Sequence, residues 1–152
     1  MKKLSITFGM IMLALGCFAF SPAAQADNGP IPIAGLWHTN YISDFTGPAF
    51  QGYQQWHSDG LEWESANAFP GAMCLGTFIP TGPRSIRLFH VGWFPGGGPN
   101  GSVRFVLTEP NTVVSPDGNS FEGRYDQKFF DANGKLVLED KGKVQATRLT
   151  VH

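Results

Sequence analysis

Two histidines and a glutamate in or beside apolar segments are the candidates for chemistry in this sequence. His57 and Glu62 flank the dipeptide Asp59-Gly60, and His90 lies within an apolar run. A histidine titrates near neutral pH, and a carboxylate that orients its ring makes it a general base. His57 or His90 with a glutamate could therefore move protons without a cofactor. The alternatives are a solvent-facing ion pair for His57 and Glu62, and a hydrogen-bonded core group for His90.

A hairpin predicted at Asp59-Gly60 decides which way these side chains point. Asp-Gly is typical of a two-residue turn between antiparallel strands. Such a turn gives the cross-strand pairs Ser58–Leu61, His57–Glu62 and Trp56–Trp63. The two tryptophans are then expected in the interior, with His57 and Glu62 on the other face of the sheet.

A metal site needs three or four converging ligands from histidine, cysteine and carboxylate side chains. The candidates are His57, Glu62, Glu64, Cys74 and His90. None of them lies at the spacing of a known ligand motif, so neither a metal nor a haem nor another cofactor is predicted. The glycine run at 96–98 precedes a strand rather than a helix, which favours a flexible lid over a phosphate-binding loop.

The N-terminus has the pattern of a signal peptide over residues 1–26. Lys2 and Lys3 precede an apolar run over 4–20, and Ala24-Gln25-Ala26 fits a cleavage site. We therefore expect an exported protein, periplasmic or secreted, with no transmembrane segment. Lipidation at Cys17 is the alternative fate of the leader. An extended lead-in over 27–34 and a single domain over 35–152 should follow.

The charge and cysteine content of the chain limit its possible partners and its sources of stability. The chain has 11 Lys and Arg, including Lys2 and Lys3 of the leader, against 12 Asp and Glu, scattered along the sequence. Nucleic acid requires a basic stripe, so it is excluded as a partner. Cys74 is the only cysteine after the leader, so the core must be stable without an internal disulfide.

Eight segments of β-type sequence separated by turn residues position these side chains. They cover about 35–42, 50–58, 61–67, 74–79, 84–93, 102–115, 121–130 and 136–151. No segment has a helical period, and the spacing is regular. The pattern predicts an all-β fold, an eight-stranded antiparallel up-and-down barrel, with a β-sandwich as the alternative.

The two ends of the domain carry a more specific signal. Gly35-Leu36-Trp37 opens the first strand, and Arg148 lies on the last one. This pair resembles the closing latch of the lipocalin-like (calycin) barrels, in which an arginine covers a tryptophan at one end. The local motifs also resemble small exported bacterial barrels of uncharacterised function. The resemblance implies an internal cavity for a small, mostly apolar molecule.

Three functions are compatible with this fold. The first is binding of a small apolar molecule in an internal cavity, and the second is a cofactor-free isomerase, cyclase or hydrolase that uses His57 or His90 with a glutamate. The third is a structural or partner-binding domain with a filled barrel. Alternation of side chains predicts the cavity lining as Trp56, Trp63, Leu88, His90, Phe105 and Tyr125.

Overall fold

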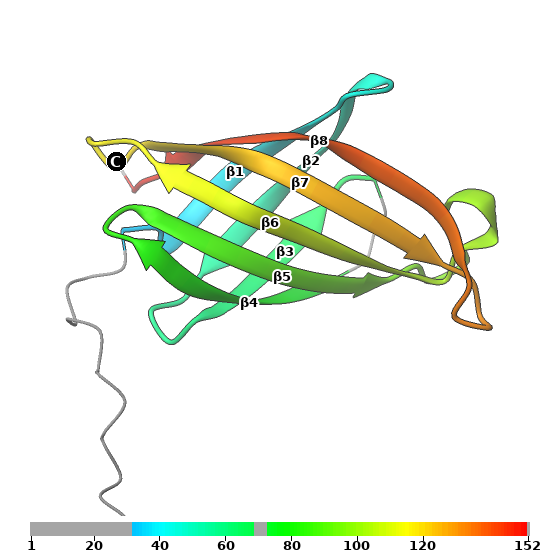
Figure 1. Cartoon of the computed structure of the whole chain (residues 1–152). Helices are drawn as coiled ribbons and strands as arrows, with labels where there is room; N and C mark the ends of the chain where they lie inside the picture. The colour runs from blue at the N-terminus through cyan, green and yellow to red at the C-terminus, as the bar shows by residue number, and fades with distance from the viewer. Residues whose placement is uncertain (1–31, 69–72, 152) are drawn as a thin grey trace, which may run out of the picture.

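The chain folds as a closed barrel of eight antiparallel strands in up-and-down order (Figure 1). The computed structural model describes residues 32–68 and 73–151. The strands are β1 (Gly35–Ser43), β2 (Gly47–Trp56), β3 (Leu61–Ala66), β4 (Met73–Gly82), β5 (Ser85–Trp93), β6 (Arg104–Val114), β7 (Ser120–Phe130) and β8 (Leu136–Leu149). One short 3-10 turn, η1 (Pro99–Gly101), lies between β5 and β6. The predicted signal peptide, residues 27–31 of the predicted lead-in, and His152 lie outside the described residues.

Every strand pairs with its neighbour in sequence, and β1 closes the barrel by pairing with β8. The predicted barrel is therefore confirmed, and the sandwich alternative is wrong. Closure removes the unpaired strand edges that a sandwich would expose. Buried and exposed side chains alternate along the strands, so one face of each fills the interior.

One end of the barrel is closed by the predicted latch. Trp37 is fully buried, its indole Nε1 donates to the Ile33 carbonyl at 2.8 Å, and the Arg148 guanidinium carbon lies 4.1 Å from the centre of its ring. Arg148 also donates to the backbone carbonyls of Pro32 and Ala34, and to that of Gly118. One side chain thus joins the lead-in, the β6–β7 turn and the tryptophan, which seals this end.

The β2–β3 hairpin differs from the prediction by one residue. His57 donates its backbone N–H to the Leu61 carbonyl at 2.9 Å, and Gly60 donates to the His57 carbonyl at 3.2 Å with a φ of +90°. This is a three-residue loop ending in a left-handed glycine, instead of a two-residue turn. Trp56 therefore aligns with Glu62, and Gln55 with Trp63.

This shift reverses the face of every side chain on β3, because side chains alternate along a strand. Glu62 and Glu64 point into the barrel and are buried, whereas Trp63 points outward and is 46 % exposed. The predicted interior position of Trp63 and the predicted solvent-facing position of Glu62 are both wrong.

The opposite end of the barrel carries the glycine-rich segment between β5 and β6 (Figure 1). Phe94 is buried there, and its ring stacks on that of Phe129 with centroids 5.8 Å apart. The ring of Phe105 lies 5.2 Å from that of Phe94. An aromatic cluster thus packs the barrel beneath the segment. Nowhere in the described parts of the chain is there a helix with the length and apolar character to cross a membrane.

Candidate functional site

A band of polar side chains crosses the otherwise apolar interior. All its members are buried and come from β1, β2, β3, β5, β6 and β7. They are Thr39, Gln54, Glu62, Glu64, His90, Glu109, Thr112 and Gln127. Burying a polar or charged group costs free energy unless a partner satisfies it, so such a band is not explained by stability alone.

His90 is at the centre of this band, bonded through one ring nitrogen. Its Nδ1 lies 2.8 Å from Oε2 of Glu62, and its Nε2 lies 3.6 Å from Oε2 of Glu64. The first distance is a hydrogen bond, and the second is too long for one. Glu62 therefore fixes the orientation of the imidazole, while Nε2 has no hydrogen-bond partner.

A glycine allows this contact to form. Glu62, Gly76 and His90 lie in one cross-strand row of β3, β4 and β5. A Cβ at Gly76 would lie 2.5 Å from Oε2 of Glu62. Because glycine has no side chain there, the carboxylate reaches across β4 to the histidine.

Glu64 is held by a hydrogen bond from β1. Its Oε1 lies 3.3 Å from the hydroxyl of Thr39, which is also 3.0 Å from the carbonyl of Gly52. Nearby, the Trp56 indole donates to Oε1 of Gln54 at 3.2 Å, and the Gln54 amide donates to the Tyr41 hydroxyl at 2.9 Å. These bonds fix the band rigidly against β1 and β2.

Glu109 is the third buried carboxyl group. The Thr112 hydroxyl donates to its Oε2, and its Oε1 has no partner. It sits where the β6–β7 register shifts between Thr108 and Thr112, around Pro110. This irregularity agrees with the disruption of strand pairing that proline imposes.

Burial sets the protonation of the cluster. It raises the pKa of Glu109 to about 8, with Thr112 opposing and the charges of Glu62 and Glu64 adding to the rise. It likewise raises the pKa of Glu64 to about 7, against the lowering effect of His90.

The pKa of His90 is raised as well, although burial acts against this rise. Burial alone would lower its pKa, but the nearby Glu62 and Glu64 carboxylates and the Cys74 thiol raise that pKa well above its ordinary value. The cluster therefore holds an imidazolium beside carboxyl groups that change protonation near neutral pH, which is the arrangement needed for proton transfer.

One trio in the described part of the chain could hold a metal ion. Glu64, Cys74 and His90 are buried and place one ligand atom each within 4.8 Å of one another. A thiolate, an imidazole and a carboxylate form a ligand set that suits zinc. The sequence spacing did not indicate the trio, because its members come from β3, β4 and β5.

The structure places the other predicted residues as follows. Trp56, Leu88, Phe105 and Tyr125 are buried on the inner face, as expected, and the Phe105 ring stacks on His90 with centroids 5.7 Å apart. His57 lies just after β2, next to the hairpin loop, and its ring is 5.9 Å from that of Trp63. Of the three catalytic candidates, Glu62 and His90 are brought together and His57 is not bonded to either.

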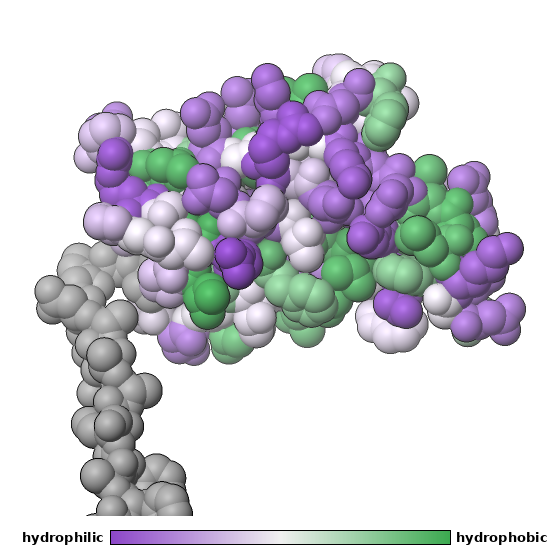
Figure 2. All heavy atoms as spheres, in the orientation of Figure 1, coloured by the Kyte–Doolittle hydropathy of each residue, from purple (hydrophilic) through white to green (hydrophobic). Residues whose placement is uncertain are grey.

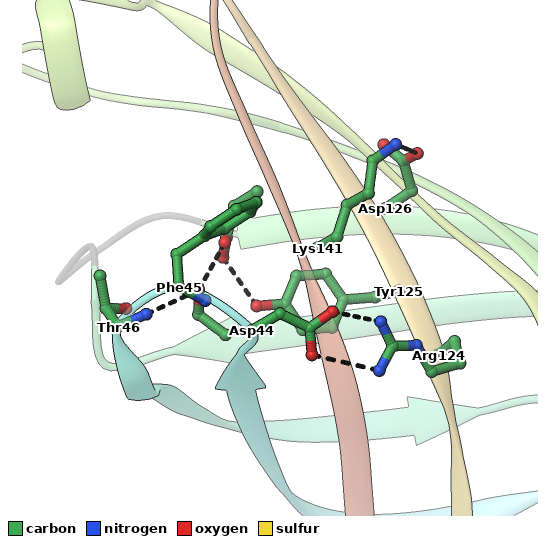
Figure 3. Close-up of polar contacts among 9 residues, drawn as sticks. Asp44, Phe45, Thr46, Arg124, Tyr125, Asp126 and Lys141 are labelled. Atoms are coloured by element: carbon green, nitrogen blue, oxygen red, sulfur yellow. Dashed lines mark hydrogen bonds and ion pairs between the residues drawn. The ribbon is translucent and has the colours of Figure 1, made fainter.

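Tyr125 lies toward the end of the barrel opposite the latch. Its hydroxyl donates to Oδ2 of Asp140 at 2.7 Å. Ion pairs surround it, with Asp44 facing Arg124 and Asp126 facing Lys141 (Figure 3). Its hydroxyl is therefore already bonded within the protein, and this polar network fastens the β1–β2 loop to β7 and β8.

The comparisons with known proteins add no relative. No family model matches the chain, and no curated protein or solved structure shows significant similarity to it. What can be stated is the class: an eight-stranded, up-and-down, closed antiparallel β-barrel, consistent with a lipocalin-like fold. This fold is compatible with ligand binding, and the interior cluster is the feature from which its function must be argued.

Proposed function

We propose that this protein is an exported barrel that binds a small, mostly apolar molecule in its interior, with one polar group of that molecule held by the cluster around His90. The observation that carries this proposal is a set of three buried atoms that lack hydrogen-bond partners. They are Oε1 of Glu62, Nε2 of His90 and Oε1 of Glu109. Each such atom costs about 1–3 kcal/mol when it is left unsatisfied in the interior. A ligand that bonds to them recovers this free energy.

The surroundings of the cluster favour an apolar body on the ligand. The wall on either side of the polar band is built from aromatic and aliphatic side chains, among them Trp56, Leu88 and Phe105. Three carboxyl groups accompany a single histidine, so the site disfavours an anionic head group. The expected ligand therefore has an apolar body and one neutral group, such as a hydroxyl, that can accept a hydrogen bond from Nε2 of His90 and donate one to a glutamate oxygen.

A matched set of probes tests this proposal. We expect 1-octanol to bind the purified protein, and octanoate and octylamine to bind at least about tenfold more weakly, because the carboxylate meets buried carboxyl groups and the ammonium meets the His90 imidazolium. Binding is measured by NMR shifts of the His90 imidazole, and native mass spectrometry checks for a co-purified small molecule. Glu62→Gln should reduce the discrimination between the probes, whereas Glu122→Gln, on the exposed outer face, should not.

Equal affinity for all three probes would contradict the predicted charge preference. An absence of shifts at His90 with every probe, together with a purified protein that carries no ligand, would favour the filled-barrel alternative instead.

Proton transfer is the second candidate function, and the Glu62–His90 bond is the observation that favours it. Nδ1 donates to the Glu62 carboxylate at 2.8 Å, so Nε2 is the atom left to exchange a proton with a substrate. Glu64, 3.6 Å away with a pKa of about 7, can accept a proton near neutral pH. Such a pair suits proton abstraction next to a carbonyl group, as an isomerase requires.

Deuterium exchange detects this activity without knowledge of the natural substrate. With 2-octanone in D2O, the protein should accelerate incorporation of deuterium beside the carbonyl by about 100-fold or more over buffer, the contribution typical of a positioned acid or base. His90→Gln should abolish the acceleration, and Glu122→Gln should leave it unchanged. If His90→Gln exchanged as fast as the parent protein, His90 would have no part in proton transfer.

A further inference from the structure

The outer surface of the barrel has an extensive apolar face on three adjacent strands. We call it the β3–β5 face. Its eight side chains point away from the interior and are between 37 % and 65 % exposed. They are Leu61, Trp63, Met73, Leu75, Ile79, Phe89, Val91 and Trp93.

The face is continuous because its members are cross-strand neighbours. Leu75 of β4 lies between Trp63 of β3 and Val91 of β5 in the strand register. Thr77 lies between Leu61 and Phe89 in the same way. Side chains so paired are about 5 Å apart, close enough to form one surface.

The rest of the outer wall is different. Ion pairs link Asp126 with Lys141 and Lys128 with Glu139 on the outside of β7 and β8. Figure 2 shows hydrophilic residues over the upper part of the view, where β7 and β8 run, and hydrophobic residues gathered below, where β4 and β5 run. Exposed large apolar side chains on other strands, such as Leu36, Tyr53 and Val113, are more scattered, whereas those of the β3–β5 face adjoin one another.

The size of the face indicates what covers it. The three aromatic members of the face have about 150–250 Å² of side-chain surface each and the five aliphatic ones somewhat less, so at the exposed fractions given above the face presents roughly 700 Å². The largest apolar patch of a typical monomer is about 300–600 Å². A standard stable interface buries about 800 Å² on each partner. The β3–β5 face is therefore larger than an ordinary surface patch and comparable with one side of a stable interface.

We propose that a second copy of this chain covers the β3–β5 face, so that the protein is a two-fold symmetric dimer with the sheets of two barrels packed face to face. A surface without charge is complementary to itself, and Arg87, at the margin beside Ile79, is the one charged outward side chain on the described parts of these strands. Two-fold dimers are the commonest assemblies, and they pair the same patch on both subunits. Leu75, in the middle of the face, lies close to the two-fold axis.

The position of Leu75 provides a direct test. Near a two-fold axis a residue meets its own copy, so Leu75→Cys should form a disulfide between chains under mild oxidation. Val113→Cys is the matched control, because Val113 is equally an outward, part-exposed aliphatic residue but lies on β6, outside the face. Cys74 is buried and should not take part in either variant.

Sedimentation of the unmodified protein gives the second measurement. It should have twice the mass of the chain at micromolar concentration, and Leu75→Lys should weaken the dimer at least about 100-fold, because it buries two unpaired ammonium groups. Val113→Lys should leave the mass unchanged. Even if Leu75→Lys failed to fold, the mass of the unmodified protein and the disulfide of Leu75→Cys would still decide the question.

Any of three results would overturn the proposal. They are a monomer at every concentration, equal cross-linking of the Leu75 and Val113 variants, and a monomer that binds phosphatidylcholine vesicles through this face. None of these measurements depends on an interior ligand, so the dimer and the proposed binding function can fail separately.

Discussion

Trp37→Ala is expected to lower the free energy of unfolding by about 3–5 kcal/mol, as large-to-small changes of buried aromatic residues do. Trp37 is completely buried and packs against Phe121, with ring centroids 4.9 Å apart. The substitution removes the hydrogen bond to Ile33 and the ring over which Arg148 lies. It therefore leaves a cavity at the closed end of the barrel, and the guanidinium of Arg148 loses the ring that it covers.

Urea unfolding monitored by circular dichroism measures this loss, and Leu36→Ala is the control. Leu36 is the neighbouring residue on β1, but it points outward and is 44 % exposed. Its substitution should cost well under about 1 kcal/mol. If the two variants were equally stable, Trp37 would not be the residue that closes the barrel.

The fold could be predicted in detail because its signals are local. Turn dipeptides and alternating side chains place the strands within a few residues of the observed bounds, and closure follows from the number of strands and the latch residues. The Trp37–Arg148 contact joins the first and last strands, and it was predicted because both residues belong to one recognisable motif.

The site was predicted only in part, because its register depends on the conformation of one turn. Asp59-Gly60 is compatible with a loop of two or of three residues, and the difference decides whether Glu62 or Trp63 faces the interior. Hydrophobicity favoured the tryptophan, and the structure has the glutamate inside. The general expectation that charges stay in solvent fails here, as it often does at functional sites.

Two glycines carried a signal that would have corrected the register. Gly52 and Gly76 face inward on the strands flanking β3, and a Cβ at either one would overlap a carboxylate of Glu64 or Glu62. Inward glycines on both neighbours of a strand indicate that long side chains project from it into the barrel. Glu109 keeps the alternation of Phe105 and Leu107, which also indicated an inward position, because the bulge around Pro110 breaks the alternation only after Glu109.

The protonation of the cluster leads to the second large effect, a stability that falls as pH rises. A carboxyl group whose pKa is higher in the folded chain binds more protons when folded, so its contribution to stability is full below its unfolded pKa and is lost as pH passes its folded pKa. For Glu109 this window runs from the ordinary value of 4.5 to about 8, and for Glu64 from 4.5 to about 7. His90 acts in the same direction, because its folded pKa also lies above the ordinary value of 6.5.

We therefore expect the free energy of unfolding to fall by several kcal/mol between pH 5.5 and pH 8.5, since each unit of pKa shift corresponds to about 1.4 kcal/mol. Glu109→Gln keeps an oxygen for the Thr112 hydroxyl but cannot ionise, so it should reduce this fall by roughly 2 kcal/mol or more. Glu122→Gln, on the outer face, should follow the parent protein at every pH. Urea unfolding at pH 5.5, 7.0 and 8.5 provides the comparison. Two outcomes would contradict the raised pKa of Glu109: a parent protein that gained stability over this range, or a Glu109→Gln variant whose stability depended on pH as steeply as that of the parent. Glu109 would then be ionised in the folded barrel at neutral pH, and the buried cluster would need a bound cation to neutralise it.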